Sequence, residues 1–151
     1  MVTWAEFADA QPEMAALGLK QLQKFGLAYL ATTRKDSMPR VNPVCPVIAE
    51  GRLFIATRRD SPKLQHLLHD GRYMLHLLPG KEEEEFWVCG VAARSTAPEL
   101  RSRVIEAAVG ITRIDDDEWL FEYDIAEAGT TVWLDFGTPN HRPQRKFWRA
   151  P

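Results

Sequence analysis

The sequence predicts a single mainly β domain of the α+β class: an antiparallel β-barrel with a few short flanking helices. Short runs rich in β-branched and aromatic residues alternate with turn residues along most of the chain. The first runs are joined by tight turns, which indicates antiparallel pairing. Strands and helices do not alternate strictly, which disfavours a parallel Rossmann-type sheet. A sheet of roughly six or seven antiparallel strands closes most economically into a barrel.

Length and composition fit one domain over residues 1–151. A hydrophobic content of 45% and a charged content of 26% are typical of a globular protein and argue against disorder. The net charge of −2 gives no chain-wide attraction to nucleic acid or anionic lipid, so we expect neither as a partner. No apolar run approaches the ~18 residues of a membrane span, and the first residues lack a signal-peptide pattern. We therefore expect a cytoplasmic protein.

Local signals define the elements of the first half. Apolar residues at helical spacing predict a helix over 12–25, which Gly26 would end. Strands are expected over 27–33, 41–49 and 53–57, with a tight hairpin at Glu50-Gly51 before the last of them. Pro43 and Pro46 lie inside the second strand, so part of its edge should be irregular or unpaired.

The second half shows the same alternation. Ser61-Pro62 opens a short helix that ends at Asp70-Gly71. Thr96-Ala97-Pro98-Glu99 reads as the capping box of a further helix. Strands are expected over 73–78, 86–94, 119–125 and 130–134, and the segment after Gly137 reads as a polar tail.

The segment from Thr57 to Lys63 lies where a strand ends and a helix begins. A helix N-terminus presents free backbone N–H groups and a partial positive charge, which suits a phosphate group. The segment adds hydroxyl donors and cations: Thr57, Arg58, Arg59, Ser61 and Lys63. The alternative is that Ser61 is only a helix N-cap followed by Pro62 in the first turn. Lys63 opposes the helix dipole and needs a separate reason to be there.

A second candidate segment runs from Arg40 through Val41 and Asn42 to Pro43. Arg40 opens an otherwise apolar strand, and Pro43 leaves an edge open to a ligand. If this strand pairs with the one that ends at Thr57, Arg40 lies near the far end of the pair. The alternative is that Arg40 is a solvated residue at a strand end.

No residue is assigned a catalytic role, and no metal site is expected. His66 and His69 stand three apart on one short helix without a carboxylate to complete a metal motif. Cys45 and Cys89 are better interpreted as small apolar residues than as nucleophiles. Trp148 lies in the polar tail without periodic support, so we expect it to cover a ligand or a partner.

Together these segments resemble the pyridoxamine 5′-phosphate oxidase-like family of flavin-binding split barrels, over about residues 22–94. The resemblance rests on a strand, a turn and a second strand, followed by a strand, a basic loop and a helix end. The matching segments are Tyr29-Leu30-Ala31-Thr32-Thr33, Pro39-Arg40-Val41-Asn42-Pro43-Val44, Leu53-Phe54-Ile55-Ala56-Thr57, Ser61-Pro62-Lys63 and Leu67-Leu68-His69-Asp70-Gly71-Arg72.

The resemblance implies a homodimeric antiparallel split β-barrel with flavin mononucleotide (FMN) at the subunit interface. Arg40, Ser61 and Lys63 would meet the phosphate of FMN, helped by Thr57, with Arg58 and Pro62 in the same loop. Val41, Asn42 and the backbone around Pro43 would lie against the isoalloxazine ring, and Trp148 is the candidate for an aromatic residue contributed by the partner subunit. A dimer also follows from size, because a small barrel has a filled interior and a ring bound outside it needs cover.

Two departures from the family argue against pyridoxamine phosphate as the substrate. Cys45 stands where the oxidases have a lysine, and the tail lacks their substrate-binding arginine and histidine segment. The leading hypothesis is an FMN-dependent oxidoreductase that passes hydride or electrons to or from a small organic molecule. The alternatives are a reductase that uses the 8-hydroxy-5-deazaflavin coenzyme on the same fold, and a non-catalytic protein that binds or senses flavin or haem.

Overall fold

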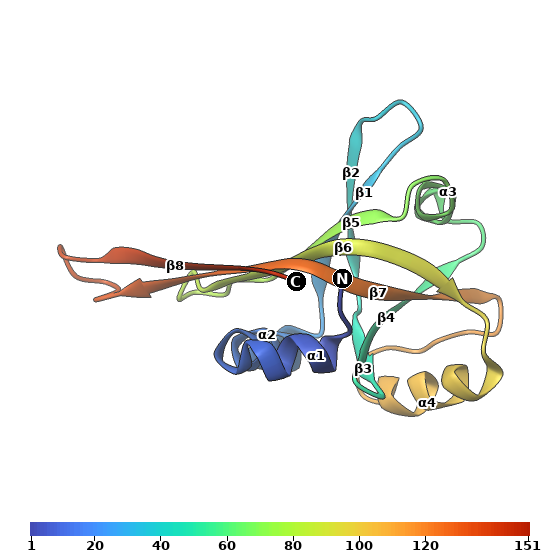
Figure 1. Cartoon of the computed structure of the whole chain (residues 1–151), viewed down its shortest axis with the longest axis horizontal. Helices are drawn as coiled ribbons and strands as arrows, with labels where there is room; N and C mark the ends of the chain where they lie inside the picture. The colour runs from blue at the N-terminus through green and yellow to red at the C-terminus, as the bar shows by residue number, and fades with distance from the viewer.

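The computed structural model describes all residues from Met1 to Pro151, and it confirms a mainly β fold with four helices and eight strands (Figure 1). The helices are α1 (Trp4–Ala10), α2 (Pro12–Phe25), α3 (Pro62–His69) and α4 (Pro98–Ala108). The strands are β1 (Ala28–Thr33), β2 (Pro39–Val44), β3 (Val47–Ala49), β4 (Arg52–Arg58), β5 (Arg72–Leu77), β6 (Glu85–Ser95), β7 (Glu118–Leu134) and β8 (Arg142–Arg149). None of the helices combines the length and the apolar character that crossing a membrane requires.

All neighbouring strands pair antiparallel, in the order β2-β1-β5-β6-β7-β4-β3, and β8 pairs with β7. The end strands of this path, β2 and β3, follow each other in the chain but do not pair with each other. The sheet therefore curls without closing, which confirms the predicted antiparallel split β-barrel. We call the gap between β2 and the β3–β4 edge the split.

The predicted strand over 41–49 is two strands. Its first part, β2, pairs with β1, and only Val47–Ala49 pairs with β4 through the hairpin at Glu50-Gly51. Pro46 has no N–H to donate, and the chain leaves the ladder at Cys45-Pro46 to cross the split. The strand that contains Arg40 was considered as a partner of the strand that ends at Thr57. That pairing is therefore wrong.

The strands predicted over 119–125 and 130–134 are one long strand, β7. Its first half pairs with β4 and its second half with β8, so two neighbours share one edge. The expected break between the two strands is a bulge instead. At this bulge the pairing of β6 with β7 shifts register between Cys89 and Gly90. The polar tail contains β8, whose mostly exposed side chains gave no strand signal.

Two helix starts differ from expectation. Helix α1 was not predicted, and it begins after Thr3 with a capping box between Thr3 and Glu6. The capping box expected at Thr96 is absent: Ala97 is the N-cap of α4, and no side chain caps that helix. The hydroxyl of Thr96 therefore lies outside the helix it was expected to cap.

The core consists of two clusters on opposite faces of the sheet. In the larger one, α1 packs aromatic side chains against β6 and β8, with the Phe7 ring 5.2 Å from Trp148 and 6.1 Å from Phe86, and α2 adds Met14 and Ala15. In the smaller one, Val104 and Ala108 of α4 cover Phe54 of β4. Both faces of β4 are therefore buried, which fixes the strand that leads into α3.

Candidate functional site

The structure brings the two predicted segments together at the split. Lys63, in the first turn of α3, lines a cavity of about 190 Å³ with Pro43 at the end of β2. The same cavity is lined by Val44, Cys45, Ala56, Thr112, Arg113 and Glu118. Lys63 is half-buried and forms no ion pair, whereas 11 of the 19 lysine and arginine side chains of the chain do. A half-buried cation without a partner indicates a place for an anion.

Burial lowers the pKa of the Lys63 ammonium, and the negative charge of Glu118 opposes this only in part. The unfolded chain therefore binds more protons than the folded chain between the lowered and the ordinary lysine pKa. Stability should then rise with pH across this window in the protein without cofactor. We expect Lys63→Ala to remove that rise, which denaturant titrations of both proteins at a series of alkaline pH values would measure. An unchanged pH slope would contradict the burial of a charged Lys63.

Two buried polar groups beside the split lack partners. The side chain of Thr57 on β4 is 1% exposed, and its Oγ1 has no hydrogen-bond partner. The Nδ2 of Asn42 on β2 is also buried without a partner. Such groups are uncommon in folded proteins because each costs free energy when left unpaired. Both residues belong to the predicted site and lie on the strands that border the split, but neither lines the cavity of Lys63.

The polar and charged residues between β4 and α3 differ in whether other groups of the chain already bind them. Ser61 is the N-cap of α3, but its hydroxyl makes no capping hydrogen bond and remains available. The exposed Pro62 begins the helix. Arg58 donates to both carboxylate oxygens of Asp60 at 3.0 Å, so its charge is engaged within the loop. Of the three cations predicted between the end of β4 and the start of α3, Lys63 alone lines the cavity at the split.

Arg40 of β2 lies near a part of α3 that follows Lys63. It is the strand-register partner of Thr32 on β1. The Oγ1 of Thr32 is 3.1 Å from Nδ1 of His66, which lies one helical turn beyond Lys63. Burial and then the positive charge of Arg40 lower the pKa of His66. Arg40 therefore faces α3 but does not line the cavity that Lys63 lines. His66 is committed to Thr32, while His69 is exposed, and the two do not share a ligand site.

A continuous row of side chains crosses the outer face of the sheet. Directly paired residues lie on the same face, and the pairs run through six strands. This outer apolar row consists of Pro43, Tyr29, His76, Trp87, Gly129 and Phe147, and the neighbouring row brings Val41, Ala31, Met74 and Cys89 to the same face. Val41 is 61% exposed and Phe147 is 72% exposed. No local signal predicts this surface, because it depends on strand register.

Gly129 keeps the outer apolar row flat. A Cβ atom at Gly129 would lie 2.4 Å from the Trp87 ring, so only glycine allows that ring to lie over β7. Trp87 in turn contacts Phe147, with 6.2 Å between ring centroids. Trp148, the next residue, packs against Phe7 of its own chain. The proposed contact of Trp148 with a cofactor stays a prediction, and Phe147 is the aromatic side chain of β8 that faces outward.

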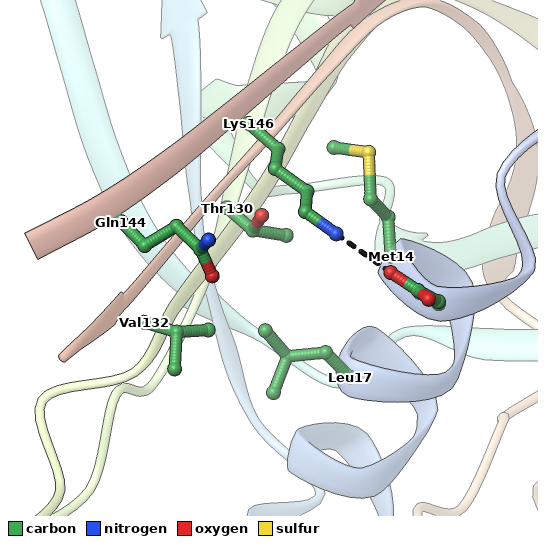
Figure 2. A pocket seen from close by; sticks show the side chains of 7 residues that line it. Met14, Leu17, Thr130, Val132, Gln144 and Lys146 are labelled. Atoms are coloured by element: carbon green, nitrogen blue, oxygen red, sulfur yellow. Dashed lines mark hydrogen bonds and ion pairs between the residues drawn. The ribbon is translucent and has the colours of Figure 1, made fainter. Parts of the chain in front are cut away.

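A further cavity of about 240 Å³ lies between α2 and the β7–β8 hairpin, away from all predicted site residues (Figure 2). Met14, Leu17 and Val132 supply its apolar wall. Lys146 Nζ lies 2.6 Å from a carboxylate oxygen of Glu13 across the opening. This ion pair links the β7–β8 hairpin to α2. The charges of Lys146 and Glu13 are therefore paired with each other and require no ligand.

Comparisons with known proteins bear on the fold. No family model matches the sequence, and no curated protein does. A NimC/NimA family protein from Clostridium acetobutylicum matches with 21% identity and a TM-score of 0.61, over 87% of this chain and 91% of that chain. A heme binding protein from Mycobacterium smegmatis matches with 18% identity and a TM-score of 0.65, over 90% of this chain and 58% of that chain.

A third similar structure carries the family description itself. A pyridoxamine 5′-phosphate oxidase-related, FMN binding protein from Nostoc punctiforme matches with 12% identity and a TM-score of 0.62, over 89% of this chain and 94% of that chain. At such identities the likeness concerns the path of the backbone, which agrees with the open antiparallel strand order described above. The chain therefore has the split β-barrel fold of the pyridoxamine 5′-phosphate oxidase-like proteins.

Proposed function

We propose that the protein binds FMN at the split and is an oxidoreductase for a small organic substrate. The observation that carries this proposal is Lys63: a half-buried cation without an ion-pair partner, at the start of α3 and beside the open edge of β2. A helix start with a lysine and a free N-cap hydroxyl suits a phosphate group. The likeness to an FMN binding protein from Nostoc punctiforme supports the same ligand.

The surrounding residues fit FMN in chemistry as well as in place. Ser61 and Lys63 would hold the phosphate, and the unpartnered Thr57 and Asn42 lie on the neighbouring strands β4 and β2. Arg40 adds positive charge at the far end of α3. Val41 and Pro43 present an exposed apolar edge to the ring. Bound flavin supplies hydride or electron transfer, so the chain itself needs only to bind it, orient it and exclude water.

We also propose that the protein is a homodimer whose interface includes the outer apolar row. A ring held against Val41 and Pro43 would remain largely in water on one subunit, whereas good sites bury roughly 70–90% of a ligand. The row continues from Pro43 across the sheet to Phe147, which gives a second copy an apolar, aromatic surface to cover.

Haem binding is the second candidate function, because His76 offers a ligand for iron. Its Nδ1 lies 2.7 Å from the carbonyl oxygen of Leu77, which makes Nδ1 the protonated nitrogen and leaves the lone pair of Nε2 available. His76 stands between Tyr29 and Trp87 in the outer apolar row, a surface suited to a flat macrocycle. The likeness to a heme binding protein from Mycobacterium smegmatis supports this alternative.

Titration of the purified protein with FMN, the 8-hydroxy-5-deazaflavin coenzyme and haem separates the candidates. We expect saturable binding of FMN with flavin absorbance that is released on denaturation, because the site offers phosphate contacts and a ring surface. Tighter binding of the deazaflavin would favour the reductase alternative. A haem absorption band that His76→Ala abolishes, without flavin binding, would replace the proposal by the haem alternative. Turnover of quinones and enones with reduced FMN then distinguishes an oxidoreductase from a protein that only stores flavin.

A further inference from the structure

A cavity of about 260 Å³ opens where the loop after β4, the end of β6, the start of α4 and the start of β7 meet. We propose that this arginine cavity binds the phosphate or carboxylate group of a small molecule, independently of the flavin phosphate at Lys63. The residues that argue for it are Arg59, Arg94, Ser95, Thr96 and Trp119, all of which line the cavity.

Two guanidinium groups lie near the ring of Trp119, and that of Arg94 stacks directly on it. The Cζ of Arg94 lies 3.4 Å from the ring centroid, and that of Arg59 lies 5.9 Å from it. Neither side chain forms an ion pair in the structure, although many other arginines of this chain do. Stacking on an indole orients the flat guanidinium and leaves its N–H edge free for two parallel bonds to an oxyanion. Both cations are therefore prepared for an anion that the chain itself does not supply.

The third arginine of the cavity has a structural role. Arg101 donates to the backbone oxygens of Asp115 and Glu118 at 2.7 and 3.0 Å, which fixes the start of β7 against α4. This anchoring holds Trp119, the next residue after Glu118, under Arg94. Arg94 and Arg59, and not Arg101, would therefore contact the ligand.

Neutral donors lie around the same cavity. The indole Nε1 of Trp119 is buried and has no acceptor in the chain. The hydroxyl groups of Ser95 and Thr96 also line the cavity, and α4 begins at Pro98 without a side-chain cap. An oxyanion would supply acceptors for these groups as well as for the arginines.

The carboxylates of the cavity restrict the ligand to a small one. Asp116 and Glu118 also line the cavity, and Glu118 accepts a hydrogen bond of 3.0 Å from the backbone N–H of Asp115. A large polyanion such as a nucleic acid would meet these negative charges, whereas a single phosphate or carboxylate can stay on the arginine side. Glu118 also lines the cavity of Lys63, so the two anion sites would be neighbours.

The indole N–H resonance of Trp119 provides a direct test in the whole protein, with the signal assigned through Trp119→Phe. We expect inorganic phosphate or succinate to shift this resonance with saturation, beyond the effect of sodium chloride at equal ionic strength. Arg94→Gln should weaken binding about tenfold, the effect of losing one charge-assisted hydrogen bond. Whichever anion saturates the signal identifies the ligand group as a phosphate or a carboxylate.

Two controls make the outcome specific. Arg103→Gln removes an arginine of α4 that pairs with Glu106 and does not line the cavity, so anion binding should be unchanged. Lys63→Ala should also leave the Trp119 response intact, which separates this site from the flavin site. If Arg94→Gln does not fold, Arg59→Gln takes its place. No saturable shift, or equal affinities in wild type and the arginine variant, would overturn the proposal.

Discussion

Lys63→Ala is expected to weaken FMN binding ten- to a hundredfold. A hydrogen bond between charged groups contributes ~1.5–3 kcal/mol, which corresponds to that change in the dissociation constant. The structure favours a strong effect because Lys63 is half-buried and forms no ion pair in its own chain, so its charge is available to the phosphate. Fluorescence titration of FMN with wild type and variant measures the change.

The stability of the protein without cofactor serves as the internal control for this variant. A cation at a helix start opposes the helix dipole, so removing Lys63 should leave the melting temperature equal or slightly higher. Lys81→Ala is the matched control, because Lys81 is exposed in the β5–β6 turn and does not line the cavity of Lys63. Equal FMN affinities for wild type and Lys63→Ala would show that Lys63 does not contact the phosphate of FMN.

Much of the fold follows from local sequence signals. The helix over 12–25 ends at Gly26, which has a φ of 65°, and the hairpin turn has positive φ at Glu50 and Gly51. Such signals act within a few residues and can be read without the rest of the chain. The strand β8 gives no such signal, because β7 is its only strand partner and most of its side chains are exposed. Its existence depends on a long-range partner.

The candidate site also contains features that local sequence predicts and features that depend on the fold. Pro43 and Lys63 were predicted separately, each from its local chemistry, and the fold places them on one cavity wall. The unpartnered state of Thr57 and Asn42 is a property of burial, which the sequence alone does not reveal. The outer apolar row depends on the register of six strands, and a shift by one residue would turn every side chain to the other face.

Met74→Glu should convert the proposed dimer into a monomer. Met74 lies on β5 in the row beside His76, near the middle of the exposed apolar face, and it is 42% exposed in the single chain. The lone subunit therefore tolerates a glutamate there, since the carboxylate stays in water. In a dimer the same carboxylate would be buried without a partner, which costs several kcal/mol. A cost of about 4 kcal/mol weakens association roughly a thousandfold.

Sedimentation velocity of wild type and variant at the same concentrations, with and without FMN, measures this effect. The matched control is Ile105→Glu, because Ile105 is 37% exposed on α4 and lies outside the outer apolar row. We expect wild type and Ile105→Glu to sediment as dimers, and Met74→Glu to sediment at 17.2 kDa with weakened FMN binding. Met74 is not among the residues proposed to hold FMN, so a joint loss of dimer and cofactor would mean that the second subunit completes the flavin site. A wild-type protein that sediments at 17.2 kDa with FMN bound would instead show that one subunit suffices.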